Sequence, residues 1–280
     1  MGYRVYFGTE KSLRSGHISN EDRYMFCEFT FMQDKKIKVL VVADGMGGLE
    51  DGEQASTNAV KGFLNSFHSD ITEIYMAHSN EEGFSLEYTA NEMRNAMVKA
   101  VQNANKEVCE KAGPAKMTGS TISAVCVFED YAVVVNVGDS PVYFYRKKKD
   151  SLKLVSVLQT RAEQDVELGK YERYSGAYYQ NDHRIYCSLG QYSSLSQEDI
   201  CCAFVGQLDD GDMILMGSDG AFGRMQEHEL LEQISDCPVD EEGFVIDSLF
   251  SNARKDKDDD QTAILFVVAN EEERNGYQQL

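Results

Sequence analysis

The sequence lacks any long apolar run and is short of positive charge. No stretch of its 280 residues approaches the roughly 20 apolar residues that a membrane span needs. Its beginning also lacks the apolar core of a signal peptide. Lys and Arg number 27 against 47 Asp and Glu, a formal net charge of −20, whereas non-specific nucleic-acid binding needs a basic surface. We therefore expect no membrane and no nucleic acid as partner, and a cytoplasmic location.

The cysteines show no disulfide framework. There are seven, an odd number, and their spacing has no regular pattern, so we expect reduced thiols, as in cytosolic proteins. Cys201 and Cys202 are adjacent in a strand-like run and are interpreted as packing residues rather than as metal ligands.

Short acidic motifs are spread along the whole chain, each next to an apolar, β-like run. They are Asn20-Glu21-Asp22, Asp44-Gly45-Met46-Gly47-Gly48, Ser218-Asp219-Gly220 and Asp259-Asp260-Gln261-Thr262. Carboxylates at strand ends are suited to hard divalent cations, because Mg²⁺ and Mn²⁺ prefer oxygen ligands. Taken singly, Asp22 or Asp259 is more often an Asx-turn or helix-capping residue. If the carboxylates do cluster, they repel one another, and bound cations would stabilise the site.

The amino-acid sequences of these motifs, and their order along the chain, resemble those of the PPM (PP2C-like) family of metal-dependent Ser/Thr protein phosphatases in its bacterial form. The matching segments are Val41–Gly48 with Gly52 and Ala55-Ser56, Gly119-Ser120-Thr121, Val137-Gly138-Asp139-Ser140, Gly211-Asp212 with Ser218-Asp219-Gly220, and Asp259–Thr262. A lone Asp-Gly pair carries no information, but five matches in the order of the family are specific. The resemblance covers nearly the whole chain.

The resemblance implies an α+β fold, a four-layer α-β-β-α sandwich of two mostly antiparallel sheets flanked by helix pairs. The order of apolar and periodic runs fits this fold. Strands are predicted at Lys38–Ala43, Thr121–Phe128, Tyr131–Val137, Val142–Tyr145, Leu152–Leu158, Met213–Met216 and Thr262–Val268, and helices at Gln54–His78, Leu86–Lys111, Glu227–Ser235 and Glu242–Asn252. We expect one catalytic domain over residues 1–270 and a polar C-terminal tail over 271–280.

The resemblance also assigns roles to individual carboxylates. It implies that Asp44 bridges two Mg²⁺ or Mn²⁺ ions, with the Gly45 carbonyl as a neighbouring ligand. Asp219 and Asp259 would complete the shell of the second ion, and Asp22 would contact the ions directly or through water. Asp139 matches the position that helps to hold a third, weaker ion in bacterial relatives, although a simple turn after a buried strand explains it equally well. The predicted catalytic residues are Asp44, Asp219 and Asp259.

The chain departs from the family at several positions. His17 stands where the family has the Arg that grips the substrate phosphate, and Arg14 lies nearby. Because Arg binds phosphate bidentately and His does not, either His17 grips the phosphate more weakly or Arg14 is recruited. Pro141 replaces an Arg, and Asp260 stands where Asn is common, in a run of aspartates whose register could slip by one. Met46 is usual in bacterial relatives, whereas eukaryotic members have a His there that is proposed as a general acid.

The segment Gln159–Leu195 lacks the usual motif of the family and contains several tyrosines, among them Tyr171, Tyr174, Tyr178 and Tyr179. It is interpreted either as the counterpart of a flap that the family carries near its site, where amphipathic rings could recognise a peptide, or as an ordinary surface loop.

The predicted function is metal-dependent hydrolysis of phosphoserine and phosphothreonine in proteins, by a water held between the metal ions, in signalling opposite a Ser/Thr kinase. The absence of a Cys-x5-Arg signature favours direct attack by water over a thiol mechanism. The alternative is a pseudophosphatase, a signalling or binding module with the same fold. Retention of Asp44, Asp219 and Asp259 argues against this alternative, whereas His17, in place of the phosphate-binding Arg, is consistent with it. Hydrolysis of a small phosphorylated metabolite is a third possibility, because the metal site reads only phosphate.

Overall fold

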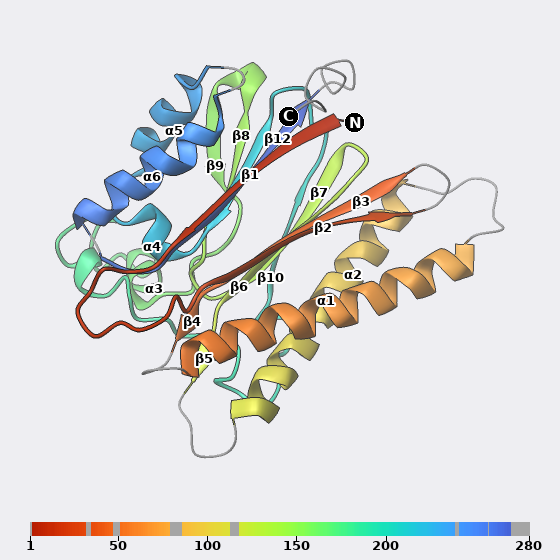
Figure 1. Ribbon diagram of the computed structural model, residues 1–280, viewed down its shortest axis with the longest axis horizontal. Coiled ribbons are helices and arrows are strands. Elements are labelled where there is room, and N and C mark those ends of the chain that lie inside the picture. Colours follow the sequence, from red (N-terminus) through yellow and green to blue (C-terminus); the bar gives the residue numbers. More distant parts are fainter. Residues whose placement is uncertain are drawn as a thin grey trace.

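The computed structural model describes residues 2–31, 35–46, 51–78, 86–112, 118–238, 241–256 and 258–269. The Gly47-Gly48 pair of the second motif and the predicted tail at 271–280 lie outside this description. Two five-stranded sheets pack face to face, with long helices on one outer side and shorter helices on the other (Figure 1). Every strand pair is antiparallel, which confirms the predicted α-β-β-α sandwich.

The first sheet has the strand order β1-β12-β11-β8-β9. Its strands are β1 (Gly2–Glu10), β12 (Gln261–Ala269), β11 (Met213–Gly217), β8 (Val142–Arg146) and β9 (Ser151–Leu154). β12 is buried along its whole length and β11 likewise, as expected for central strands with both faces covered.

The second sheet has the order β10-β7-β6-β3-β2. Its strands are β10 (Cys201–Val205), β7 (Tyr131–Val137), β6 (Ile122–Phe128), β3 (Lys36–Ala43) and β2 (Arg23–Thr30). The predicted hairpin between β6 and β7 is confirmed, with Phe128 paired to Tyr131 across Glu129-Asp130. A short ladder of β4 (Gly45–Met46) and β5 (Gly119–Ser120) continues from one end of this sheet.

The helices cover the outer faces of the sheets. Helices α1 (Asp51–His78) and α2 (Leu86–Ala112) pack on the second sheet, whereas α4 (Asp219–Phe222), α5 (Glu227–Ser235) and α6 (Gly243–Asp256) pack on the first. The predicted stripe of α2 is buried in the helix–sheet core, as Met93, Met97, Ala100, Ala104 and Val108. A further apolar core fills the space between the two sheets. None of the helices in the described ranges is both long and apolar enough to cross a membrane.

The structure differs from the prediction at β9 and at the edge strands β1 and β2. The strand predicted at Leu152–Leu158 ends at Leu154, because the next two backbone N–H groups, of Val155 and Ser156, both donate to the Val142 carbonyl and the ladder stops there. Strands β1 and β2 were not predicted. They are edge strands with mostly half-buried residues, so neither shows a continuous apolar run or a clean alternation. All seven cysteines are free thiols, as predicted.

Candidate active site

Five aspartates of the predicted site lie where strands end or begin. Asp22 precedes β2, Asp44 joins β3 to β4, Asp139 follows β7, Asp219 opens α4 after β11, and Asp259 lies two residues before β12. The sandwich thus draws carboxylates from both sheets, and from sequence positions more than 200 residues apart, toward one end of the molecule.

The carboxylate of Asp44 is the electrostatic centre of this group. Burial raises its pKa well above the ordinary value, and the carboxylates of Asp22, Asp219, Asp139 and Asp259 raise the pKa further. The four other side chains are therefore close enough to Asp44 to act on its charge. The backbone of Asp44 is fixed from both sides, because its N–H donates to Thr121 Oγ1 at 2.9 Å and its carbonyl accepts from Thr121 N at 2.8 Å.

The side chain of Asp22 is buried, with 4% of the residue exposed. Its Oδ2 accepts a hydrogen bond from Ser218 Oγ at 2.7 Å, whereas its Oδ1 is buried without a hydrogen-bond partner. Burial raises the pKa of Asp22 to about 7, and the charges of Asp260 and Asp219 add to the rise, while hydrogen bonds from Ser218 and Thr262 oppose it. A buried carboxylate oxygen without a donor is costly, and a bound cation is one group that would satisfy it.

Two glycines let backbone segments meet at this site. A Cβ on Gly45 would lie 2.1 Å from the Gly52 carbonyl oxygen, and a Cβ on Gly220 would lie 2.0 Å from the Asp260 carbonyl oxygen. Real Cβ atoms do not approach so closely, so both motifs need glycine for packing as well as for backbone approach to a ligand.

The residues present fit a hard divalent cation. The five predicted ligand side chains are all carboxylates, and the Oδ1 atom of one of them, Asp22, lacks a hydrogen-bond donor. Oxygen-only donor sets of this kind suit Mg²⁺ or Mn²⁺. The structure thus places Asp22, Asp139, Asp219 and Asp259 close enough to act electrostatically on Asp44, with Gly45 directly after it. Among the described residues, the ligand atoms that lie within 4.8 Å of one another belong to His17, Glu21 and Asp260.

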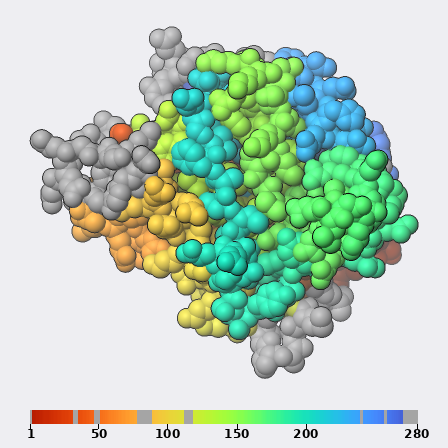
Figure 2. Space-filling model, turned by 180° about the vertical axis from the view of Figure 1, so that it is seen from behind, coloured from red at the N-terminus to blue at the C-terminus, as the bar shows by residue number. Residues whose placement is uncertain are grey.

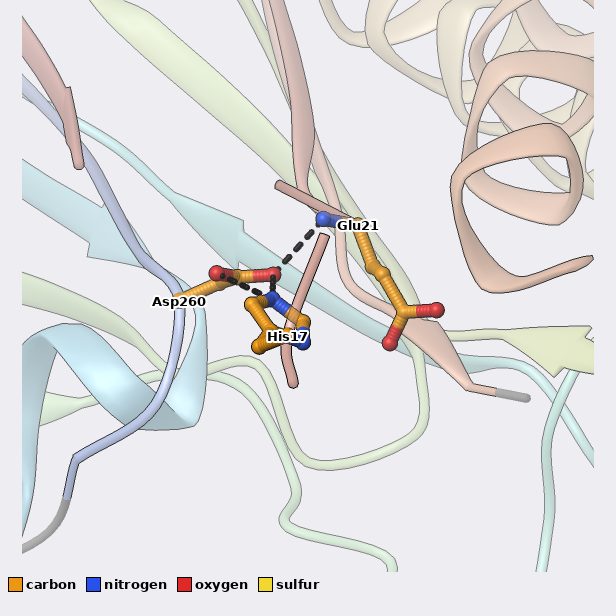
Figure 3. A group of neighbouring side chains, drawn as sticks. All are labelled: His17, Glu21 and Asp260. Atoms are coloured by element: carbon orange, nitrogen blue, oxygen red, sulfur yellow. Dashed lines mark hydrogen bonds and ion pairs between the residues drawn. The ribbon is translucent and has the colours of Figure 1, made fainter. Parts of the chain in front are cut away.

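His17, a candidate phosphate ligand, is held by Asp260 (Figure 3). Its Nε2 lies 2.8 Å from Oδ1 and 2.9 Å from Oδ2 of Asp260, and only 9% of its side chain is exposed. Asp260 also accepts hydrogen bonds from the backbone N–H groups of Ser12 at 2.8 Å and Glu21 at 2.7 Å. The Glu21 side chain points away from Asp260. Its carboxylate nevertheless offers an oxygen within 4.8 Å of ligand atoms of His17 and Asp260.

Arg14, the other candidate phosphate ligand, is exposed. Within the described ranges its guanidinium makes no ion pair or side-chain hydrogen bond, and its charge acts on Glu21. The pKa of Glu21 is raised mainly by burial, and the positive charges of His17 and Arg14 partly oppose that rise. Arg14 therefore has an available guanidinium near Glu21, whereas the ring of His17 is already engaged by Asp260.

The segment Gln159–Leu195 lies against the carboxylate group. A cavity of about 320 Å³ has Asp139 and Asp219 in one wall and Tyr174, Tyr178 and Tyr179 in another. Tyr171, which was grouped with these tyrosines, is not part of the lining; its hydroxyl donates to Asp165 at 3.3 Å. Figure 2 shows the green part of this segment as a lobe on the surface, beside the blue C-terminal helices.

Several residues of the site were not found by sequence reasoning. Asp260 was considered only as a possible ligand, yet it binds three separate donors. Arg173 and Arg224 line the cavity without belonging to any recognised motif. The one sequence signal for them is that arginines are uncommon in so acidic a chain.

Comparisons with known proteins agree with this geometry. A family model described as protein phosphatase 2C matches residues 11–241. The serine/threonine phosphatase stp of Listeria innocua is 24% identical over 205 residues, which cover 72% of this chain and 73% of the relative. Among solved structures, the serine/threonine phosphatase PstP/Ppp of Mycobacterium tuberculosis superposes with a TM-score of 0.72 at 19% identity, covering 96% of this chain and 99% of that one.

A second solved structure contains metal. It is the catalytic domain of the serine/threonine protein phosphatase PstP in complex with two manganese ions, with a TM-score of 0.66 and 20% identity, covering 96% of this chain and 99% of that one. The sandwich is thus the fold of these serine/threonine phosphatases. The chain belongs to the protein phosphatase 2C family, and its class of enzyme is protein serine/threonine phosphatase.

Proposed function

We propose that this protein hydrolyses phosphoserine and phosphothreonine esters in proteins by direct attack of water, with Mg²⁺ or Mn²⁺ as cofactor. The observation that carries the proposal is the group of four aspartates whose charges act on Asp44, with one buried oxygen of Asp22 lacking any donor. Two divalent cations would supply Lewis acidity to the attacking water and positive charge to the phosphoryl oxygens. The residues that would hold them are Asp44, the Gly45 carbonyl, Asp219 and Asp259, with Asp22 beside them and Asp139 as ligand of a third, weaker ion.

The residues of the chain have separate tasks in this scheme. Thr121 holds the Asp44 backbone, and Ser218 orients the Asp22 carboxylate, so the carboxylates are positioned before substrate binds. Arg14 is the favoured group for orienting the substrate phosphate, because its guanidinium is exposed and its charge reaches Glu21. Within this scheme no side chain forms a bond to phosphorus.

The family membership supports phosphoprotein substrates, and a Ser/Thr kinase with the opposite activity is the partner that this chemistry implies. One domain over residues 1–270 and a cytoplasmic location remain predictions from sequence. The alternative, a pseudophosphatase module, is not favoured, because all five aspartates are present and the other four act on the charge of Asp44.

The test is phosphate release from phosphoserine and phosphothreonine peptides by protein stripped with EDTA and then given Mn²⁺ or Mg²⁺. We expect no turnover after stripping and full turnover after either ion is restored. A small aryl phosphate measured in parallel separates loss of chemistry from loss of peptide binding. Turnover that persists in EDTA, or that no divalent ion restores, would contradict the proposal.

A further inference from the structure

The cavity beside the carboxylates has the size and position to receive a side chain of a bound peptide. Its volume is about 320 Å³, and it extends from Asp139 and Asp219 to Arg224. A phosphoryl group placed at the aspartates would therefore leave the neighbouring residues of its peptide over this cavity. Aromatic walls with a few polar groups are typical of binding pockets.

Most charges of the cavity wall are already matched within the protein. Arg173 pairs with Glu163 and lies 3.9 Å from Glu227, and Glu163 also accepts from the Tyr178 hydroxyl at 2.6 Å. These contacts fix the wall.

A second pair lies in the same wall. His183 Nδ1 is 3.5 Å from an Asp182 oxygen. This contact is an ion pair only when the His183 ring is protonated, so the contacts of Glu163 with Arg173 and Tyr178 are the ones that fix the charges of this wall.

Arg224 is different. It follows α4 and is exposed. Its guanidinium carbon lies 4.8 Å from the centre of the Tyr179 ring, and the Tyr179 hydroxyl donates to the Arg224 carbonyl at 3.4 Å. In the part of the chain that the structure describes, no ion pair is made by this guanidinium. Stacking holds a planar guanidinium in place while its N–H groups remain available for a carboxylate or phosphate.

We propose that Arg224, held on the Tyr179 ring, is a specificity-determining residue that selects phosphopeptides with an acidic side chain close to the phosphorylated residue. This inference rests on the proposed phosphatase function and adds the class of substrate. Arg224 binds a carboxylate of the peptide through its outward N–H groups. On a protein with a net charge of −20, an acidic peptide is otherwise repelled, so the cation at this end of the cavity favours peptides that place an acidic side chain against it.

The experiment compares matched phosphopeptides in which Glu or Gln stands one, two or three residues before or after the phosphoserine. For the unmodified protein with Mn²⁺, we expect KM to be about two- to fivefold lower for the best Glu peptide than for its Gln counterpart, the range for an exposed ion pair. The preference should shrink in 0.5 M NaCl, since salt screens exposed charges.

Three variants test the residue. Arg224→Gln should remove the preference, and Arg224→Glu should reverse it in favour of Lys at the same peptide position. Tyr179→Leu, which removes the ring under the guanidinium, should weaken the preference. The matched control is Arg184→Gln, because Arg184 is an exposed arginine of the segment Gln159–Leu195, which carries Tyr179, and does not line the cavity; it should leave the ratio of KM values unchanged.

The outcomes separate the two proposals. If the unmodified protein releases no phosphate from any phosphopeptide, the proposed function fails. If it hydrolyses the Glu and Gln peptides with equal KM at every position, or if Arg224→Gln and Arg184→Gln change the ratio alike, the assignment to Arg224 is overturned while the phosphatase function stands.

Discussion

His17 and Asp260 face each other across 243 residues of sequence, with Nε2 of the ring 2.8 Å and 2.9 Å from the two carboxylate oxygens. The position of His17 matches an arginine of the family and that of Asp260 an asparagine, so both members of the contact differ from the family pattern. The pair ties the segment before Asp22 to the segment that carries Asp259. We interpret His17 as a residue that positions the site rather than as a group that grips phosphate.

The contact between His17 and Asp260 should contribute to the free energy of unfolding. We expect a double-mutant cycle of His17→Asn and Asp260→Asn to give a coupling free energy of about 1–3 kcal/mol in urea unfolding, as for buried residues in direct contact. Removal of His17 alone leaves the Asp260 carboxylate, which is 5% exposed, with only the backbone donors of Ser12 and Glu21.

The surface pair Asp182 and His183 is a matched control, with side chains 34% and 59% exposed and 3.5 Å apart. Its coupling should stay below about 0.5 kcal/mol. Equal coupling in the two cycles would show that the His17–Asp260 contact has no special role.

Turnover should depend on Asp44. Asp44→Asn removes the charge on which the four other aspartates act, and we expect phosphate release to fall by at least about two orders of magnitude, the scale for loss of a charge-stabilising group. The measurement is single-turnover and steady-state phosphate release at saturating Mn²⁺. Asp236→Asn, at an exposed helix end, serves as control, and wild-type turnover in the Asp44 variant would refute the metal assignment.

Metal should stabilise the fold. Cations that bind only the native state add about 2.7 kcal/mol at a hundredfold excess over Kd, which is several degrees of Tm in a domain of this size. Stripped Asp44→Asn protein should melt above stripped wild type, because one repelling carboxylate is gone, yet gain little from Mn²⁺. Calorimetry with and without Mn²⁺ checks both statements; an unchanged Tm in wild type would mean that the aspartates bind no ion.

Substrate binding should depend on Arg14 more than on His17. Arg14→Ala removes the exposed guanidinium and is expected to raise KM for phosphopeptides severalfold, with a smaller change in kcat. Arg14→Lys should recover only part of the loss, since an ammonium lacks the fork. His17→Arg should change KM less than Arg14→Ala does. Initial rates at one pH decide the order, and a larger effect at His17 would return the phosphate-binding role to that residue.

Glycine at position 220 should be essential. A Cβ there would lie 2.0 Å from the Asp260 carbonyl and 3.0 Å from the Asp259 Cβ, so Gly220→Ala must displace the strand end that carries both aspartates. We expect a loss of about 1–3 kcal/mol in unfolding free energy and most of the activity. Gly176→Ala is the control, because nothing lies within 4 Å of its added Cβ and its stability should change by less than about 0.5 kcal/mol.

The sequence predicts elements whose pattern is local. The buried stripe of α2 repeats at three- and four-residue steps, and β3 is a continuous apolar run, so both are legible from their own residues. The edge strands β1 and β2 are stabilised by a partner on one side only, and their half-buried residues carry no such pattern. The candidate metal ligands could be named from sequence because their motifs resemble those of a known family.

Contacts between distant segments could not be predicted in the same way. That His17 meets Asp260, or that Arg224 lies on Tyr179, depends on the packing of loops from both sheets. No single stretch of sequence encodes either contact, and Arg224 belongs to none of the family motifs.

The place of β12 has a consequence for how the enzyme is made. β12 lies between β1 and β11, and its register runs from Gly2 opposite Ala269 to Glu10 opposite Gln261. The first described strand, β1, therefore has no neighbour in its sheet until β12 has been synthesised. This pairing joins residues very far apart in sequence, and such contacts form slowly. Because Asp259 arrives with that last strand, a partly synthesised chain holds an incomplete set of carboxylates. Incomplete chains on the ribosome should thus have no phosphatase activity, and activity should appear in one step when β12 pairs with β1 and β11.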